Sequence, residues 1–155
     1  MFDILGFLRR KKARRTPRQQ TGRAAEHAAE RFLRKHGYRI LARNVTYTQG
    51  EVDLVAVEKR TGALCFVEVR SRAEADGDPR VAPEETVTPA KRRRIIRASR
   101  RFLGDRRAPG IPRWAEAYTG TIRFDVIAVR FQGADRKQPD IRHYPGAFDF
   151  RGRLL

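Results

Sequence analysis

The sequence predicts an α/β domain in which helices flank a central β-sheet. Helix-type periodicity covers residues 22–36 and 89–103, and β-branched apolar runs cover residues 38–48, 50–57, 64–70 and 121–129. A chain of 155 residues fits one domain, and a hydrophobic content of 40% is enough for one core. We expect this domain to span residues 21–133. A basic, disordered tail precedes it over residues 1–20, and a C-terminal extension follows it over residues 134–155.

The first helix is predicted from small and apolar residues that recur at helical spacing: Ala25, Ala28, Ala29, Phe32 and Leu33. Thr21 is the expected N-cap and Gly37 the expected end, with residues 16–20 as a linker. Glu30 has an ion-pair partner four residues on, at Arg34. Glu26 has none and borders the apolar stripe. It points over the sheet edge or stays solvated beside Arg23, and the sequence leaves both open.

The two central runs form a hairpin whose register follows from its turn. A four-residue loop that closes Glu58 against Ala63 places Asp53 opposite Glu68, and Glu51 opposite Arg70. Side chains opposed in this way have Cβ atoms roughly 4.5–5.5 Å apart, and like charges there are destabilising. A divalent cation relieves that repulsion, because hard cations bind carboxylate oxygens. A strand-end acid paired with a strand-end arginine is the simpler alternative. Cys65 is expected as a small buried hydrophobe, and one cysteine allows no internal disulfide.

The second helix is predicted to begin after Thr88, with Pro89 at its first position, and to stop at Gly104. Its apolar stripe is Ile95, Ile96, Ser99, Phe102 and Leu103. Its outer surface is expected to hold seven bases and no acid: Lys91, Arg92, Arg93, Arg94, Arg97, Arg100 and Arg101. These bases repel one another until a polyanion arrives.

The segments around this helix are less regular. Residues 71–86 read as a long loop, and the acids Glu74, Asp76 and Asp78 within it fit that loop better than a metal cluster. Residues 121–129 are a strand, residues 141–144 a short one, and the remaining tail is irregular.

The charge of the chain indicates its partner. Thirty-five basic residues against eighteen acidic ones give a net charge of +17 and a pI near 11.4. Such a balance points to nucleic acid or an anionic membrane surface as partner. No apolar stretch approaches the ~20 residues of a membrane span. At the N-terminus the apolar residues come before the basic ones, the reverse of a secretory signal. We therefore expect a cytoplasmic protein whose partner is nucleic acid; a homodimer stays open.

An ordered series of segments resembles the YraN family, a bacterial group within the restriction-endonuclease-like superfamily, similar to archaeal Holliday-junction resolvases. It begins with Thr21-Gly22, Glu26 and Phe32-Leu33. The series continues through residues 43–44, 50–55, 66–72, Val87 with Lys91, and 123–128. The spacing from Asp53 to Glu68 and on to Arg70 matches the PD-(D/E)xK nuclease signature of that superfamily. The resemblance covers residues 21–131 and implies a restriction-endonuclease-like fold, with a mixed central sheet flanked by helices.

The resemblance also implies site residues. Asp53, Glu68, the main-chain oxygen of Val69 and Glu26 would bind Mg²⁺ or Mn²⁺, and Glu51 would help to position metal or water. The departure is Arg70, where the signature has lysine. Arginine keeps its proton and cannot act as a base, although it can stabilise a phosphate electrostatically.

Lys91, at the start of the basic helix, is open to two interpretations. It is either a titratable helper of the site or one more phosphate-binding lysine.

These residues predict a Mg²⁺- or Mn²⁺-dependent endonuclease that hydrolyses phosphodiester bonds in DNA and is selective for structure over sequence. The cation would polarise the phosphate, and the bases Arg93, Arg94, Arg97, Arg100 and Arg101 would hold the flanking backbone. Two other functions stay open. One is a nucleic-acid-binding module with a vestigial site, and the other is a membrane-surface or partner-binding protein that acts through residues 1–12.

Overall fold

A computed structural model describes residues 16–73, 87–104, 120–131 and 139–155. Helix α1 (Pro17–Lys35) leads into strands β1 (Tyr38–Tyr47), β2 (Gly50–Glu58) and β3 (Leu64–Ala73). Helix α2 (Pro89–Gly104) and strands β4 (Ile122–Phe131) and β5 (Asp140–Phe148) follow. The expected loop acids at 74, 76 and 78 and the tail residues 1–15 lie outside the described residues.

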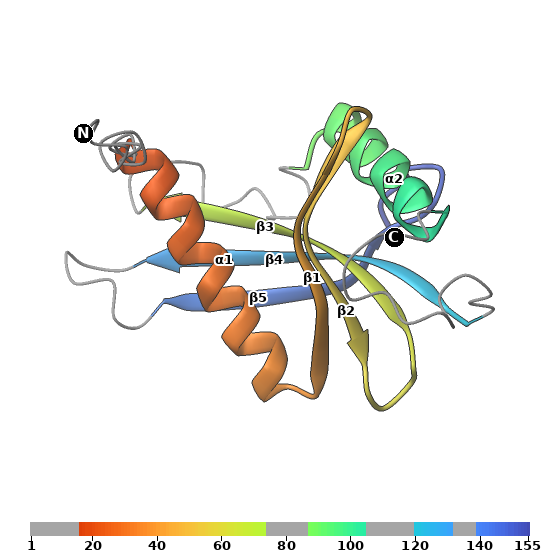
Figure 1. Ribbon diagram of the computed structural model, residues 1–155. Coiled ribbons are helices and arrows are strands. Elements are labelled where there is room, and N and C mark those ends of the chain that lie inside the picture. The colour runs from red at the N-terminus through yellow and green to blue at the C-terminus, as the bar shows by residue number, and fades with distance from the viewer. Residues whose placement is uncertain (1–15, 74–86, 105–119, 132–138) are drawn as a thin grey trace, which may run out of the picture.

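The five strands form one mixed sheet in the order β1-β2-β3-β4-β5. Only the β3–β4 pair is parallel; the other three pairs are antiparallel. Figure 1 shows the β1–β2 hairpin running across the direction of β3, β4 and β5, with α1 in front of those three strands. This architecture confirms the predicted α/β class with a restriction-endonuclease-like arrangement.

Helix α1 starts earlier than its apolar pattern predicted. Thr16, not Thr21, is the N-cap: its hydroxyl accepts a hydrogen bond from Gln19 N at 3.3 Å, and the Gln19 side chain accepts one from Thr16 N. Pro17 occupies the first turn, where its missing N–H costs nothing. The residues expected as a linker are therefore the first turn of α1.

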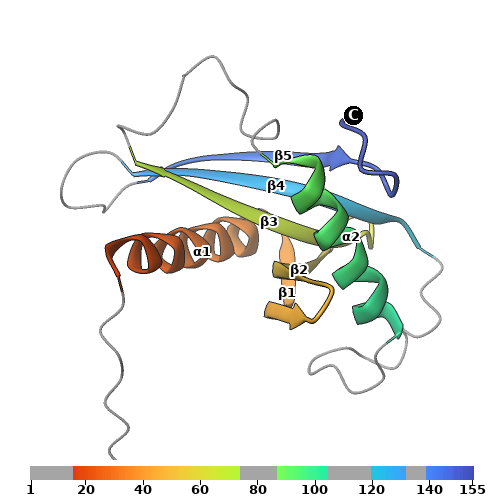
Figure 2. The same cartoon turned by 90° about the horizontal axis from the view of Figure 1, so that it is seen from above.

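The α1 side of the sheet is built from small residues. Ala25, Ala28 and Ala29 are buried and let the helix approach β2, β3 and β4 closely (Figure 2). Cys65 is fully buried there, as expected, and burial raises the pKa of its thiol to about 12. The thiol is therefore protonated and acts as a small apolar side chain.

The α2 side holds an aromatic cluster. Phe66 packs edge-on against Phe102 and stacks with Phe124, which in turn stacks on Phe148 of β5. Part of the predicted C-terminal extension, residues 134–155, is thus strand β5. This strand is longer than the short one expected at 141–144. Its contribution to the core ties residues 140–148 to the domain.

Gly50 fixes the tip of the β1–β2 hairpin against α2. A Cβ atom at this position would lie 2.3 Å from the main-chain oxygen of Arg94. Only glycine allows the two backbones to come so close. This contact holds the neighbouring Glu51 near the first turn of α2.

Candidate metal centre

The candidate centre lies at a fork where β2 leaves β3. The two strands pair from Val57 opposite Leu64 to Leu54 opposite Val67. One step further, the same register sets Asp53 opposite Glu68, as the four-residue turn predicted. Main-chain pairing between β2 and β3 stops there, and the Asp53 Oδ2 atom accepts a hydrogen bond from Val69 N at 2.7 Å. The Asp53 carboxylate therefore takes the place of a main-chain acceptor and is held rigidly at the fork.

Glu68 is a buried carboxyl with an unsatisfied oxygen. Its exposed fraction is 2%, and its Oε2 atom is one of two buried side-chain polar atoms without a hydrogen bond among the described residues. Burial, and then the charge of Asp53, raise the pKa of Glu68 to about 8. Burial likewise raises the pKa of Asp53. Two carboxyls in this setting resist simultaneous ionisation unless positive charge joins them.

Lys91 supplies positive charge from the first turn of α2. Its Nζ atom lies 2.8 Å from Glu51 Oε1 and 3.4 Å from Glu68 Oε2. Burial alone would lower the pKa of Lys91, but the charge of Glu68 and the hydrogen bond to Glu51 outweigh it and raise this pKa. The same hydrogen bond lowers the pKa of Glu51. Lys91 is thus a protonated counter-ion of Glu51 and Glu68.

Arg70 lies on the other side of the buried carboxyl. One guanidinium nitrogen is 3.7 Å from Glu68 Oε1, and 41% of the Arg70 side chain is exposed. The separation is that of a loose ion pair, so the head group stays available to solvent and to an incoming anion. Arg70 is therefore placed beside the carboxyls, where the signature position led us to expect it.

Glu26 reaches the centre from α1 through Asn44. Burial and then the charge of Asp53 raise the pKa of Glu26, while a hydrogen bond with the Asn44 side chain opposes this shift. The β1–β2 register runs from Arg43 opposite Leu54 to Val45 opposite Val52. Asn44 between them therefore faces Asp53.

The backbone of Asn44 is itself unusual, and sequence reasoning did not assign this residue to the site. Its φ angle is 49°, in the left-handed region that non-glycine residues rarely occupy and that asparagine tolerates best. Such conformations persist where the surrounding structure holds them, often at functional sites. Two signals in the sequence could have pointed to Asn44. Asparagine tolerates the left-handed backbone region, and Arg43-Asn44 is one of the segments that resemble YraN proteins.

Glu30, by contrast, is structural, as its sequence position indicated. Hydrogen bonds from Arg43, and more weakly Arg34, lower the pKa of Glu30 to about 2. Its nearest Arg43 contact is 2.6 Å. These bonds join α1 to β1 beside the fork and use both oxygens of Glu30.

The donor atoms at the fork suit a hard divalent cation. Asp53 and Glu68 offer carboxylate oxygens, the ligands that Mg²⁺ and Mn²⁺ prefer, and Glu68 Oε2 accepts no hydrogen bond and has only the 3.4 Å ion pair with Lys91. Across the described ranges, no three Asp, Glu, His or Cys side chains lie close enough together to form a complete metal site. The ammonium group of Lys91 lies between Glu51 and Glu68. A cation fits by donor type, provided that Lys91 moves away from Glu68.

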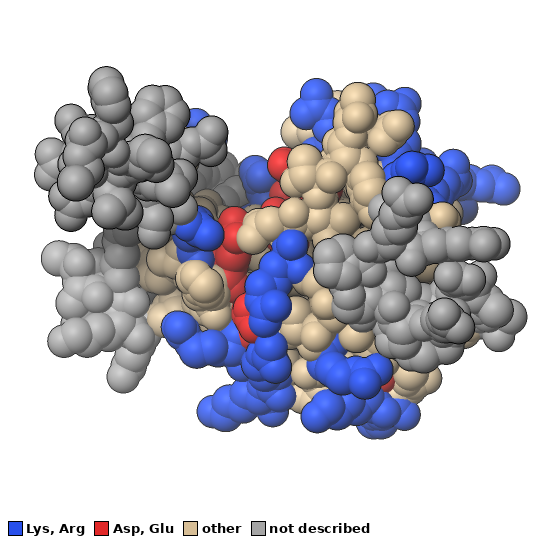
Figure 3. All heavy atoms as spheres, viewed as in Figure 1, with Lys and Arg blue, Asp and Glu red and all other residues tan. Residues whose placement is uncertain are grey.

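Basic residues border the acids. Figure 3 shows acidic side chains in a narrow band between α1 and the β1–β2 hairpin, with Lys and Arg on either side of the band. All five predicted phosphate-binding arginines of α2 are exposed: Arg93, Arg94, Arg97, Arg100 and Arg101. Arg92 was expected on the same surface, but it is 9% exposed. Its Cβ lies 3.8 Å from where a Cβ at Gly152 would be, because the C-terminal segment packs over it.

A family model described as "Uncharacterised protein family UPF0102" matches residues 25–129, which include all of the fork. The chain belongs to the UPF0102 family. This membership confirms the resemblance to YraN proteins, and the fold is the one that the resemblance implied.

Relatives of this UPF0102 chain match it over most of its length. A UPF0102 protein of Syntrophotalea carbinolica is 40% identical over 135 residues, which are 87% of this chain and 96% of the relative. One of Anaeromyxobacter dehalogenans is 41% identical and covers 88% and 89%. One of Desulfosudis oleivorans is 42% identical and covers 85% and 92%. Their names state the family and no activity.

A second charged cluster of the UPF0102 chain lies away from the fork. Asp125 is fully buried and accepts hydrogen bonds from Arg123, the His143 ring and Gly146 N, at 2.8–3.0 Å. These bonds outweigh burial and lower the pKa of Asp125. Arg123 also bonds Glu58 at the base of the hairpin. The cluster therefore joins β4, β5 and the hairpin, a structural role. In the described part of the chain, no helix is long and apolar enough to cross a membrane.

Proposed function

We propose that this protein is a divalent-cation-dependent nuclease that hydrolyses phosphodiester bonds in nucleic acid, with DNA as the expected substrate. The observation that supports this most strongly is the pair formed by the half-buried Asp53 and the buried Glu68 at the fork. Glu68 Oε2 is buried without a hydrogen bond. A fold keeps two neighbouring carboxyls in such a place at a cost to stability, which is understandable if they serve a cation.

The residues of the fork have separable tasks. Asp53 and Glu68 would hold Mg²⁺ or Mn²⁺, with the main-chain oxygen of Val69 as a third donor. The bound cation would polarise the scissile phosphate and lower the pKa of water. Glu26, held by Asn44, would reach the cation from the α1 side.

Lys91 and Arg70 would supply positive charge to the substrate. Lys91, which is 3.4 Å from Glu68 Oε2, would turn toward the phosphate once a cation neutralised Glu68. Arg70 already stands beside Glu68 with an accessible head group and would offset the growing charge on the scissile phosphate. The arginines of α2 would hold flanking phosphates, which gives affinity without sequence reading.

A second candidate is a nucleic-acid-binding module without catalysis. Arg70 in place of the signature lysine, and the Lys91 ion pair that neutralises the acids without a metal, favour it. Binding to nucleic acid would be the same in both cases. The membrane-surface alternative depends on residues 1–12, which lie outside the described residues.

Cleavage separates these candidates. Purified protein is incubated with junction, flap, single-stranded and duplex DNA in Mg²⁺, Mn²⁺ or EDTA. We expect cleavage with either cation, none in EDTA, and at least a 100-fold loss in Asp53→Asn. Asp140→Asn is the matched control, because Asp140 is a part-exposed acid on β5. Cleavage that persists in Asp53→Asn contradicts the assigned site, and no cleavage of any substrate by the wild type favours the binding module.

A further inference from the structure

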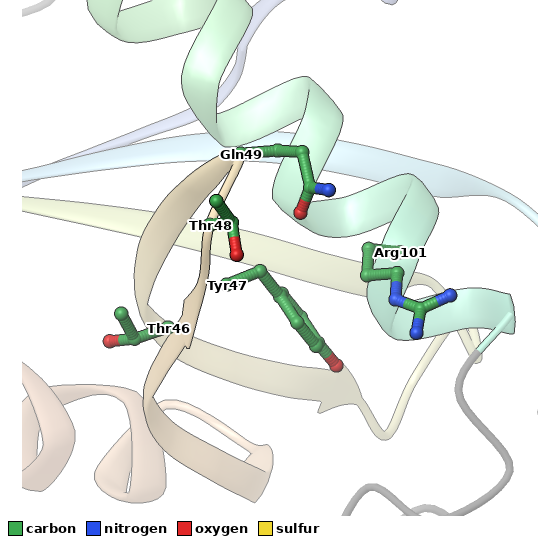
Figure 4. A pocket seen from close by; sticks show the side chains of 5 residues that line it. All are labelled: Thr46, Tyr47, Thr48, Gln49 and Arg101. Atoms are coloured by element: carbon green, nitrogen blue, oxygen red, sulfur yellow. The ribbon is translucent and has the colours of Figure 1, made fainter.

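A pocket lies between the tip of the β1–β2 hairpin and the C-terminal half of α2 (Figure 4). Its volume is about 570 Å³, and it is lined by Thr46, Tyr47, Thr48, Gln49 and Arg101. The packing of Gly50 against Arg94 holds the hairpin over the helix and so forms the pocket. The volume falls within the 300–1,000 Å³ that is usual for small-molecule sites.

The lining combines groups that recognise a nucleobase attached to a phosphate chain. Tyr47 presents a phenol ring, and stacking on such rings is worth ~1–3 kcal/mol per base regardless of sequence. Arg101 offers a cation to a phosphate or a base plane. The Gln49 amide and the threonine hydroxyls can both donate and accept hydrogen bonds. The lining contains no carboxylate that would repel phosphate.

One row of α2 links this pocket to the fork. Arg94, Arg97 and Arg101 are exposed and follow the i, i+3, i+7 spacing of one helix face. Arg94 lies close enough to Glu51 for its charge to lower that acid's pKa, whereas Arg101 lines the pocket. From Lys91 to Arg101 the helix rises roughly 15 Å. About four stacked nucleotides, at ~3.4 Å each, span that length.

We propose that this pocket binds an unpaired nucleobase of the substrate strand, about four nucleotides from the phosphate held at the fork. Tyr47 stacks on the base, the Arg101 guanidinium contacts the plane of the same base, and Gln49 contacts the base edge. The protein therefore favours nucleic acid with single-stranded nucleotides next to the cleavage point. The distance to the cleavage point rests on the proposed nuclease function, but the pocket's occupant does not.

The test measures binding in EDTA, so it is independent of cleavage. Dissociation constants are compared for a twelve-nucleotide single strand of thymidines and for a fully abasic strand of the same length. Both have the same phosphates, so only base contacts differ. We expect the thymidine strand to bind about 5- to 150-fold more tightly, the range that one stacked base gives. Equal binding overturns the proposal.

Variants locate the base contact. Arg101→Gln and Arg100→Gln each remove one exposed charge of α2, but only Arg101 lines the pocket. Tyr47→Leu keeps apolar packing against the α2 cluster and removes the ring, whereas Tyr47→Phe keeps both. We expect the preference for thymidine to shrink at least threefold in Tyr47→Leu and Arg101→Gln, and to persist in Arg100→Gln and Tyr47→Phe. Gln49→Ala, at an exposed position, is a further test that does not threaten folding.

Two outcomes would overturn the assignment. One is a thymidine preference that is the same in Tyr47→Leu, Arg101→Gln and Gln49→Ala as in the wild type. The other is competition by a free nucleotide. If thymidine monophosphate displaces the thymidine strand at the same concentration as the unlabelled strand does, the ligand of the pocket is a free nucleotide and not a base within a strand.

Discussion

Glu68 is the residue on which the chemistry of the fork depends most. Its pKa is raised to about 8, first by burial and then by Asp53, so the folded protein holds a proton that the unfolded chain releases near pH 4.5. Stability therefore falls as the pH rises from about 4.5 to about 8 in EDTA, because the folded state binds more protons over that window.

Replacing Glu68 with Gln should remove this loss of stability at high pH. At pH 8 in EDTA we expect Glu68→Gln to unfold with a free energy higher than that of the wild type by on the order of 1–3 kcal/mol. Urea unfolding at pH 5 and pH 8 measures it. Glu51→Gln is the control of opposite sign, since its partner Lys91 lowers the pKa of Glu51. A wild-type pH dependence that survives in Glu68→Gln would show that the proton resides elsewhere.

Arg70 should act through its charge and not through proton transfer. Arg70→Lys keeps the charge beside Glu68 and should retain substantial activity. Arg70→Ala should lose roughly 100-fold in kcat, the typical cost of one charge-stabilising donor. Its DNA affinity should hardly change, because one charge among +17 matters little. The measurements are kcat and Kd for each variant, and an unchanged kcat in Arg70→Ala would remove this role.

The sequence alone indicated that Asp53 lies opposite Glu68, because the length of the four-residue turn fixes the register of the β2–β3 hairpin. It indicated Lys91, forty residues from Glu51, only as a candidate helper of the site and not its ion pairs with Glu51 and Glu68. Those contacts depend on how closely α2 approaches the hairpin. Asn44 was missed for a similar reason, since its left-handed backbone is visible only in three dimensions.

At the scale of elements, the position of the hairpin on α2 decides the geometry of both the fork and the pocket. Gly50→Ala would place a Cβ 2.3 Å from Arg94 O and 2.8 Å from Arg94 C, which are main-chain atoms with little freedom to shift. We expect a loss of about 1–3 kcal/mol, as for other overpacked sites, measured by thermal unfolding.

The control is Gly22→Ala in α1. Nothing lies within 4 Å of a Cβ there, so alanine should stabilise the helix by about 0.5–1 kcal/mol. Equal effects of the two substitutions would show that the hairpin contact does not constrain the fold.

The exposed face of α2 should supply the electrostatic part of nucleic-acid binding. Neutralising Arg93, Arg97 and Arg100 together should flatten the slope of log K against log salt on duplex DNA. The slope should change by about 0.9 for each phosphate that the helix no longer neutralises. The matched control removes three exposed arginines of other elements: Arg31, Arg60 and Arg142. A slope that changes equally in both triple variants would mean that binding responds to total charge and not to this helix.

Element boundaries were predictable where apolar periodicity was strong. β1, β2, β3, β4 and α2 lie close to their predicted ranges. The first turn of α1 has only polar residues and proline, so periodicity offered no signal, although Thr16 and Gln19 form a capping box that the sequence contains. β5 includes Pro145 and Gly146 and has few buried residues, so its extent was underestimated.

At the scale of the whole molecule, a strongly basic chain encloses a small acidic site. The net charge of +17 would attract a polyanion to the surface, whereas at the fork Glu68 is buried beside Asp53, Lys91 and Arg70. Composition predicted the first property. The hairpin register predicted that the two acids face each other, but it did not predict the burial of Glu68. The contrast fits a protein that attracts nucleic acid everywhere and acts on it at one place.

The proposed function depends on a divalent cation that binds between Asp53 and Glu68, and calorimetric titration with Mn²⁺ at pH 8, without nucleic acid, measures this binding itself. We expect saturable binding to the wild type, at least tenfold weaker binding to Asp53→Asn and Glu68→Gln, and unchanged binding to Asp140→Asn. Because the cation must displace Lys91, Lys91→Met should bind Mn²⁺ more tightly than the wild type. Equal Mn²⁺ affinity in the wild type, Asp53→Asn and Glu68→Gln would show that the cation does not bind at the fork.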